Sequence, residues 1–323
     1  MRLFALLMLV PGFALAQAAY PNMENFGVDV DKSADWYQQC LKVADAKPAP
    51  APSVSAAPKC DASDAYYLKL DQAVTSDAEW AAVRSCAVAS QNTAVLSMLY
   101  ANGLGVPRDT AVATRYACST GAALAEMEGR VQHLASLAPN ERYDHCDNIT
   151  SGTMGAVCSA IAARRAERIK TAFTRHVRSS LAPAQTAAFD RLLSAGQAFA
   201  KTHAENETAP GGSGYTGFVI DAQARENEWL REHLAAFEKG QFPPAANFAA
   251  DDAELNRLYA ARMHPAQPDP NAVQPDAIRA TQRLWLGYRD AWVAFAARRY
   301  PQMDAAALKA LLTQWRIKQL QRV

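Results

Sequence analysis

The sequence lacks the short motifs on which hydrolases and metalloenzymes depend. It has no His-Glu-x-x-His segment, and its six histidines are scattered, so a helical zinc site is not indicated. Ser213 lies in a Gly-Gly-Ser-Gly segment without the strand–turn–helix context of a nucleophile elbow. Glu126 and Glu128 are two residues apart, which places them on different faces of a helix. The sequence therefore predicts a protein that is not an enzyme and has no catalytic residue, metal or cofactor.

An excess of charge of one sign is also missing, because 33 Lys and Arg stand against 32 Asp and Glu. This balance gives no reason to expect nucleic acid or an anionic membrane as a partner. Long apolar runs are scarce too. The run Leu3 to Leu15 is shorter than the roughly 20 residues of a membrane-spanning helix, and no other run approaches that length.

The run Leu3 to Leu15 has the features of a secretory signal peptide. It follows Arg2 and precedes small residues at Ala16 and Ala18. We expect residues 1–18 to be removed, with cleavage after Ala16 or, preferentially, Ala18. The mature chain is then expected to have no transmembrane segment and to lie in the bacterial periplasm or outside the cell.

The cysteines are few and even in number, and none forms a Cys-x-x-Cys pair. They are Cys40, Cys60, Cys86, Cys118, Cys146 and Cys158. In an exported protein this pattern favours disulfides over a metal site, although fifteen pairings are formally open. The Pro/Ala-rich stretch 47–58 favours an extended linker, and pairing of nearest neighbours predicts a Cys40–Cys60 bridge across it.

Alternation typical of strands is scarce and alanine is abundant, so the fold is predicted to be all-α. Helices are expected at residues 33–46, 159–178, 189–207, 221–237 and 278–295. In the last of these, Trp285, Tyr288, Trp292 and Phe295 recur at steps of three and four residues. This spacing gives the helix one aromatic face, which we expect to pack in a core.

Residues 61–138 contain two helical stretches separated by glycines. The relevant positions are Tyr100, Gly103, Gly105, Val106, Asp109, Ala113 and Tyr116. This pattern resembles a Sel1-like repeat, an α/α hairpin in which Gly103 and Gly105 would turn with positive φ and Pro107 would start the second helix. A degenerate copy upstream would contain Cys86. Because Cys86 and Cys118 lie about one repeat apart, we predict a bridge between them.

The last 73 residues, 251–323, carry a second pattern, in three blocks. The matching positions are Asp252, Leu255, Asn256 and Tyr259, then Gln282, Trp285, Tyr288, Arg289 and Asp290, then Thr313, Arg316, Ile317 and Leu320. These blocks resemble the lysozyme inhibitor LprI-like family of small secreted helical domains. Trp292 departs from the family, which often has Glu-Cys shortly after Arg-Asp.

Residues 146–238 resemble a degenerate copy of the same family. The leader from Cys146 to Cys158 before a long helix also occurs at the start of such domains, which implies a Cys146–Cys158 bridge. Placing Gln197 on Gln282 sets His203 on Tyr288. The predicted division is therefore a signal peptide (1–18), an N-terminal helix and loop (19–60), a Sel1-like region (61–138) and two LprI-like units (146–238 and 251–323).

Gln282, Arg289, Asp290 and Arg316 are the most distinctive polar residues. The favoured interpretation is a structural clamp in which Asp290 accepts from Arg316 and Gln282 holds a backbone group, and the alternative is a ligand-facing role. The segment Gly211, Gly212, Ser213, Gly214, Tyr215, Thr216 and Gly217 is either a plain turn or a loop that binds a partner through Tyr215.

The resemblance implies an exported protein that binds another protein and that inhibits a lysozyme. The alternative function is a periplasmic scaffold that acts through the Sel1-like repeats.

Overall fold

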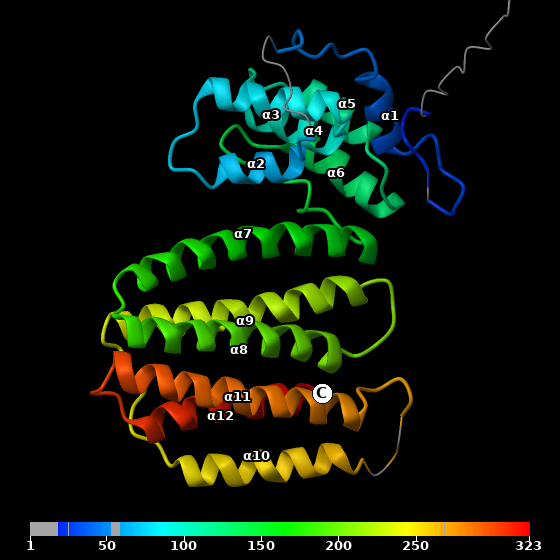
Figure 1. The fold of residues 1–323 in the computed structure, drawn as a ribbon. Helices are drawn as coiled ribbons and strands as arrows, with labels where there is room; N and C mark the ends of the chain where they lie inside the picture. Colours follow the sequence, from blue (N-terminus) through cyan, green and yellow to red (C-terminus); the bar gives the residue numbers. More distant parts are fainter. Residues whose placement is uncertain (1–18, 25, 53–58, 266, 268) are drawn as a thin grey trace, which may run out of the picture. The chain divides into compact units, whose positions relative to one another are not determined.

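A computed structural model describes residues 19–24, 26–52, 59–265, 267 and 269–323. Within these residues the chain forms twelve α-helices and no strand, which confirms the all-α prediction (Figure 1). None of these helices is both long and apolar enough to cross a membrane. The expected signal peptide lies outside the described residues.

The described part of the chain folds into two compact units. The first contains the described residues up to Ala62 together with Ser76–Asn148, and the second contains Ser63–Thr75 and Ile149–Val323. The helices are α1 Asp35–Lys42, α2 Ala62–Leu70, α3 Asp77–Ala89, α4 Thr93–Asn102, α5 Thr110–Ser119, α6 Leu124–Ser136, α7 Gly152–Ser179, α8 Pro183–Glu207, α9 Tyr215–Glu238, α10 Phe248–Met263, α11 Pro275–Arg299 and α12 Ala305–Arg322.

In the first unit, successive helices from α3 to α6 pack on one another, and α1 packs on α6 and α5. The turn between α4 and α5 is as predicted, because Gly103 and Gly105 both have φ of +66°. A side chain at Gly105 would place its Cβ 2.5 Å from the Cβ of Trp80, so α3 also requires glycine there. The prediction for Pro107 is wrong: α5 begins at Thr110, and the side chain of Asp109 caps it by accepting from the Val112 amide.

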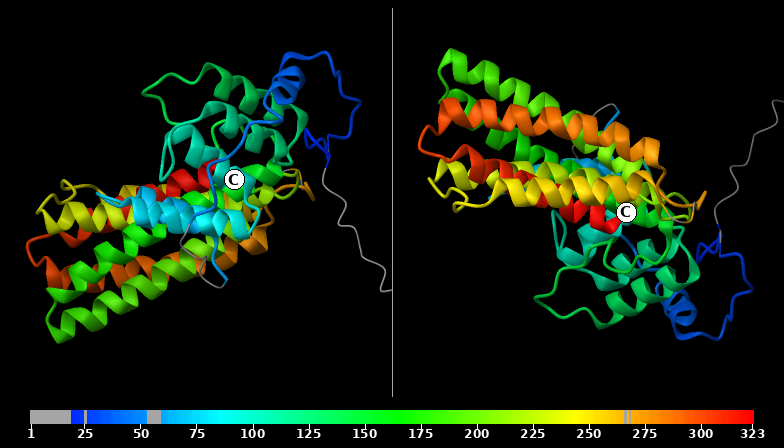
Figure 2. Two further views of the ribbon diagram at one scale, coloured as in Figure 1. Left: turned by 90° about the horizontal axis from the view of Figure 1, so that it is seen from above. Right: turned by 90° about the horizontal axis from the view of Figure 1, so that it is seen from below.

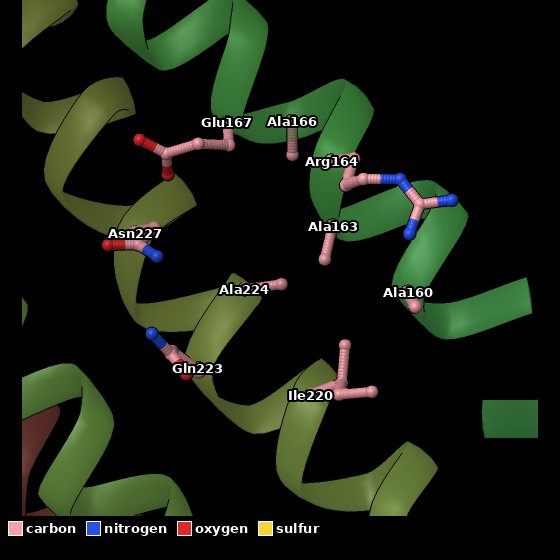
Figure 3. A pocket seen from close by; sticks show the side chains of 9 residues that line it. All are labelled: Ala160, Ala163, Arg164, Ala166, Glu167, Ile220, Gln223, Ala224 and Asn227. Carbon is pink, nitrogen blue, oxygen red and sulfur yellow. The ribbon is translucent and has the colours of Figure 1, made fainter. Parts of the chain in front are cut away.

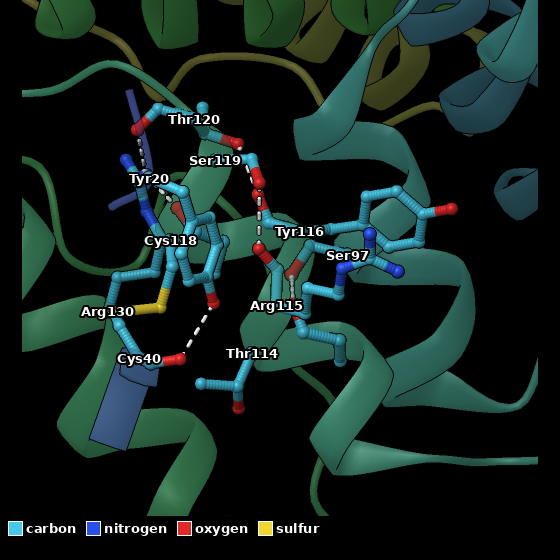
Figure 4. The surroundings of a disulfide bond; sticks show 12 residues. Tyr20, Cys40, Ser97, Thr114, Arg115, Tyr116, Cys118, Ser119, Thr120 and Arg130 are labelled. Atoms are coloured by element: carbon cyan, nitrogen blue, oxygen red, sulfur yellow. Dashed lines mark hydrogen bonds between the residues drawn. A yellow bond between two sulfur atoms is a disulfide. The ribbon is translucent and has the colours of Figure 1, made fainter. Parts of the chain in front are cut away.

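Two of the predicted disulfides are wrong. Cys40 is bonded to Cys118 (Figure 4), with a Cα–Cα distance of 5.8 Å. Cys60 is bonded to Cys86, with a Cα–Cα distance of 6.0 Å. The physical reason is that α1 packs on α5 and α6, which brings Cys40 to the end of α5, so order along the chain does not decide the pairing. The remaining cysteines, Cys146 and Cys158, are disulfide-bonded as well, and no cysteine is free.

In the second unit the long helices lie side by side in layers: α7, then α8 with α9, then α11 with α12, then α10 (Figures 1 and 2). One hydrophobic core extends through α8 to α12. It includes the predicted aromatic face, because the exposed fractions of Trp285, Tyr288, Trp292 and Phe295 are 3% or less. That prediction is confirmed. Gly196 on α8 makes room for this face, since a Cβ there would lie 3.1 Å from the Tyr288 ring.

Several helix ends differ from the prediction. Helix α7 begins at Gly152 and not at Ser159, because the Ser151 side chain caps it by accepting from the Met154 amide. Cys158 therefore lies inside a helix. Helix α9 begins at Tyr215, which is six residues earlier than expected, and α1 covers only the middle of the predicted range.

Candidate partner-binding site

The second unit contains a buried ion pair between α12 and α8. The Arg316 guanidinium donates to both carboxylate oxygens of Glu207, at 2.7 and 2.8 Å, and neither side chain is exposed. The Nε of Arg316 donates to Oε1 of Gln282 at 2.9 Å. Two-point hydrogen bonding of this kind fixes the relative position of both partners, so this contact holds α12 and α11 in register with α8.

The predicted partner of Arg316 is therefore wrong. Asp290 accepts instead from its neighbour Arg289 at 3.3 Å, and its side chain is 68% exposed. The Arg289 guanidinium also lies 5.2 Å from the ring centre of Trp285. Gln282 does not hold a backbone group but accepts from Arg316. The helix turns Asp290 toward solvent, whereas Arg316 faces the core, so the two cannot meet.

Glu226 on α9 forms the other half of this network. Its carboxylate accepts from Trp315 Nε1 at 2.9 Å and from Gln319 Nε2 at 2.7 Å, and His203 Nδ1 lies 3.2 Å away. Gln319 also accepts from Arg316 at 3.2 Å, which joins the two halves. Sequence reasoning missed Glu207 and Glu226, because single carboxylates within long helices look like part of a solvated face.

The carboxylates and the guanidinium group of this network are each held by hydrogen bonds. Both carboxylates accept from buried donors, and Arg316 is held by three acceptor side chains, Glu207, Gln282 and Gln319. Buried charges of this kind are tolerated when they are paired and hydrogen-bonded in this way. The favoured interpretation of Gln282 and Arg316 as a structural clamp is retained with Glu207 as the partner, and these residues have little capacity left for a ligand.

A pocket of about 230 Å³ lies over the network, between α8, α9 and α12. Its lining includes Glu207, Glu226 and Trp315, together with the exposed side chains of Arg225 and Arg322 and the exposed ring of Phe218. A partner that approached this pocket would therefore meet an aromatic ring and two guanidinium groups before it reached the buried carboxylates.

The predicted partner-binding segment, Gly211–Gly217, is divided between a loop and a helix. Gly211 and Gly212 are exposed, with positive φ, whereas Tyr215 to Gly217 form the first turn of α9. Tyr215 is partly buried and its hydroxyl donates to the Glu205 carbonyl at 3.4 Å. Its role as an anchor for a partner remains a prediction.

One glycine on each helix, Gly152 on α7 and Gly217 on α9, allows the two helices to approach closely. A Cβ at Gly152 would lie 2.2 Å from the Ser213 backbone, and one at Gly217 would lie 3.3 Å from the Ala156 amide. Part of the glycine content therefore has a packing role. A second pocket, of about 580 Å³, is lined by the ends of both helices, and Phe218 borders it as well.

A third cavity, of about 340 Å³, separates the middle of α7 from α9 (Figure 3). Four of its nine lining residues are alanines, including Ala163 and Ala224, and Arg164 and Glu167 also line it. No cluster of reactive groups lines it. In the described residues, no group of three or more His, Cys, Asp and Glu is arranged to hold a metal ion.

Two shifted pKa values report how polar groups are packed in the same unit. Burial raises the pKa of the Tyr288 hydroxyl inside the aromatic core. Burial would also raise the pKa of Glu238, but hydrogen bonds from Arg299 at 2.7 Å and Tyr300 at 2.6 Å outweigh it, and the pKa is lowered. Glu238 therefore remains a carboxylate that joins the end of α9 to the end of α11.

These features define a helical protein whose disulfides and buried ion pair hold its surface in a fixed arrangement. In comparison with known proteins, residues 245–320, which cover α10, α11 and most of α12, match the family model of the lysozyme inhibitor LprI. The match supports the resemblance stated for the C-terminal unit. No curated protein and no solved structure matches the chain. The Sel1-like region and the degenerate LprI-like copy remain predictions.

Proposed function

We propose that this is an exported protein that inhibits a lysozyme by covering its active site, without chemistry of its own. The observation that carries the proposal is the match of residues 245–320 to the lysozyme inhibitor LprI. The disulfide bonds of all six cysteines support an exported protein, because such bonds persist in oxidising compartments.

The arrangement of α8 to α12 supports inhibition by a preformed surface. The Arg316–Glu207 pair and the shared core hold the LprI-like helices against α8 and α9. A surface held in this way loses little conformational entropy on binding, and this favours tight association. Such an inhibitor needs no reactive side chain on α8 to α12, because it acts by binding alone.

The direct test is a titration of several lysozymes, from different structural classes, with the purified protein that begins after the expected signal peptide. We expect inhibition of at least one enzyme that saturates at a fixed molar ratio of inhibitor to enzyme. A Trp285→Ala variant, which loses a core side chain, serves as the destabilised control. Full lysozyme activity at an excess of folded protein over every enzyme would refute the proposal.

A second function, as a periplasmic scaffold, is favoured by one observation. Helices α3 to α6 pack successively, with Gly103 and Gly105 forming the turn typical of helical repeats, and such repeats present extended binding surfaces. Site-specific cross-linking in the native envelope distinguishes the two functions. Cross-links from exposed positions on α3 to α6 to an envelope protein other than lysozyme would favour the scaffold.

A further inference from the structure

We propose that the lysozyme-binding surface is centred on Phe218, with Arg225 and Arg322 beside it, and that its occupant is the acidic cleft of the enzyme. This inference rests on the proposed function and adds the location and chemistry of the contact. In the rest of this subsection, Phe218, Arg225 and Arg322 are called the α9–α12 patch.

Phe218 is unusual because it is an aromatic ring that faces solvent. Its exposed fraction is 60%. The other large hydrophobic side chains that are exposed in the described residues are aliphatic. The ring lies over Gly214, where a Cβ would come within 3.1 Å of two ring atoms. The missing side chain at Gly214 therefore leaves room for the ring. Exposed aromatic side chains with restricted motion are typical centres of protein interfaces.

Phe218 also lies between two hollows of the surface. It borders the pocket of about 230 Å³ over the buried ion pair and the pocket of about 580 Å³ beside the glycine loop. A ring between two depressions can be surrounded by a partner on both sides, which excludes water from the contact. Such exclusion is a property of residues that contribute most to binding energy.

The charged side chains beside the ring are positive and exposed to a partner. Arg225 follows Phe218 by two helical turns on α9, so both lie on the same face, and Arg322 is in the last turn of α12. Both arginines are exposed and line the same pocket as Phe218. Neither forms an ion pair within the described part of the chain.

The buried carboxylates of this pocket do not cancel that positive character. Glu207 is neutralised by Arg316, and Glu226, whose donors Trp315 and Gln319 are uncharged, contributes one negative charge against the two guanidinium groups. Asp221 lines the other pocket, on the glycine side of Phe218. On the α12 side of the ring, a partner therefore meets two guanidinium groups, neither of which forms an ion pair in the described part of the chain.

A lysozyme fits this surface by charge. Enzymes that hydrolyse glycosidic bonds place two carboxyl groups on either side of the scissile bond, in a cleft open to the sugar chain. Guanidinium groups bind carboxylates through paired hydrogen bonds, and opposite charges accelerate and orient association. With the ring of Phe218 inserted and Arg225 and Arg322 at the catalytic carboxylates, the substrate would be excluded.

The test uses the full mature chain, two variants of the patch and two matched control variants. Phe218→Ala removes the ring, and the double variant R225E/R322E reverses the charge. The controls are Ile169→Ala on α7, which is 56% exposed, and the double variant R175E/R191E, whose arginines are exposed on α7 and α8. Arg191 lies about 24 Å along α8 from Glu207. We expect each patch variant to weaken inhibition at least about tenfold with an unchanged melting temperature, and the controls to inhibit like wild type.

A second measurement identifies the occupant. Affinity is compared for an active lysozyme and for one whose catalytic carboxylates are replaced by amides. Wild type should bind the amide enzyme more weakly than the active enzyme, whereas R225E/R322E should not, because its carboxylates repel those of the active enzyme and the coupling between the charges is reversed. If wild type inhibits and the patch variants inhibit equally well, the patch is wrong while the proposed function stands. If wild type inhibits no lysozyme, both are wrong.

Discussion

Arg316 on α12 and Glu207 on α8 form a two-point ion pair in which both side chains are fully buried. The two residues are 109 positions apart in the sequence, and their contact joins the helix that matches LprI to a helix outside the match. The LprI-like helices therefore do not complete their own polar network. They depend on α8 and α9 for its acidic partners.

This relationship predicts that Arg316→Ala lowers the free energy of unfolding by about 3–5 kcal/mol, because it leaves the Glu207 carboxylate buried without a counter-ion. Denaturant unfolding followed by tryptophan fluorescence measures the change. The matched control is Asp290→Ala, which removes an exposed side chain and should change stability by less than about 0.5 kcal/mol. Equal losses in the two variants would show that the pair does not hold the helices.

The aromatic core gives a second prediction. Trp285→Ala should cost about 3–5 kcal/mol, because it removes a side chain that is 1% exposed in the centre of the core. Leu284, its neighbour in sequence, is 38% exposed, so Leu284→Ala should change the melting temperature little. Thermal melts of the two variants provide the comparison. A similar melting temperature for both would contradict the placement of α11.

The disulfides give a third prediction. Digestion of the unreduced protein should release peptides in which Cys40 is linked to Cys118 and Cys60 to Cys86. Because the Cys40–Cys118 bond closes a loop of 78 residues, its removal by Cys40→Ala and Cys118→Ala should cost on the order of 4 kcal/mol. Mass spectrometry of the digest checks the pairing, and a Cys40–Cys60 peptide would show that the pairing is wrong.

The buried side chain of His145 gives a fourth prediction, which concerns how the stability of the first unit depends on pH. Burial, followed by the charge of Arg130, lowers the pKa of this histidine to about 3. The unfolded chain takes up a proton near pH 6.5 that the folded chain does not. Stability of this unit should therefore fall as pH decreases from about 6.5 toward 3. His145→Gln, which cannot be protonated, should flatten this slope in melts recorded across that range. An unchanged slope would assign the acid sensitivity to other groups.

The sequence by itself determined the elements that depend on local pattern. The steps of three and four between Trp285, Tyr288, Trp292 and Phe295 place all four on one helical face, and a wide aromatic face has to be buried. Gly103 and Gly105 were predicted to have positive φ because a tight turn between two helices requires a residue without a side chain. The match to LprI covers residues 245–320, which include this aromatic face.

The tertiary structure decided the contacts between residues far apart in the chain. Nothing near Cys40 in the sequence indicates Cys118, because the pairing follows from the packing of α1 on α5 and α6. Glu207 and Glu226 look like ordinary helical carboxylates until α12 brings Arg316, Trp315 and Gln319 to them. Phe218 has no distinguishing local pattern in the sequence, and only the packing of α9 leaves it exposed. Local periodicity shows which face of a helix is apolar, but the partner of each face depends on how the helices pack.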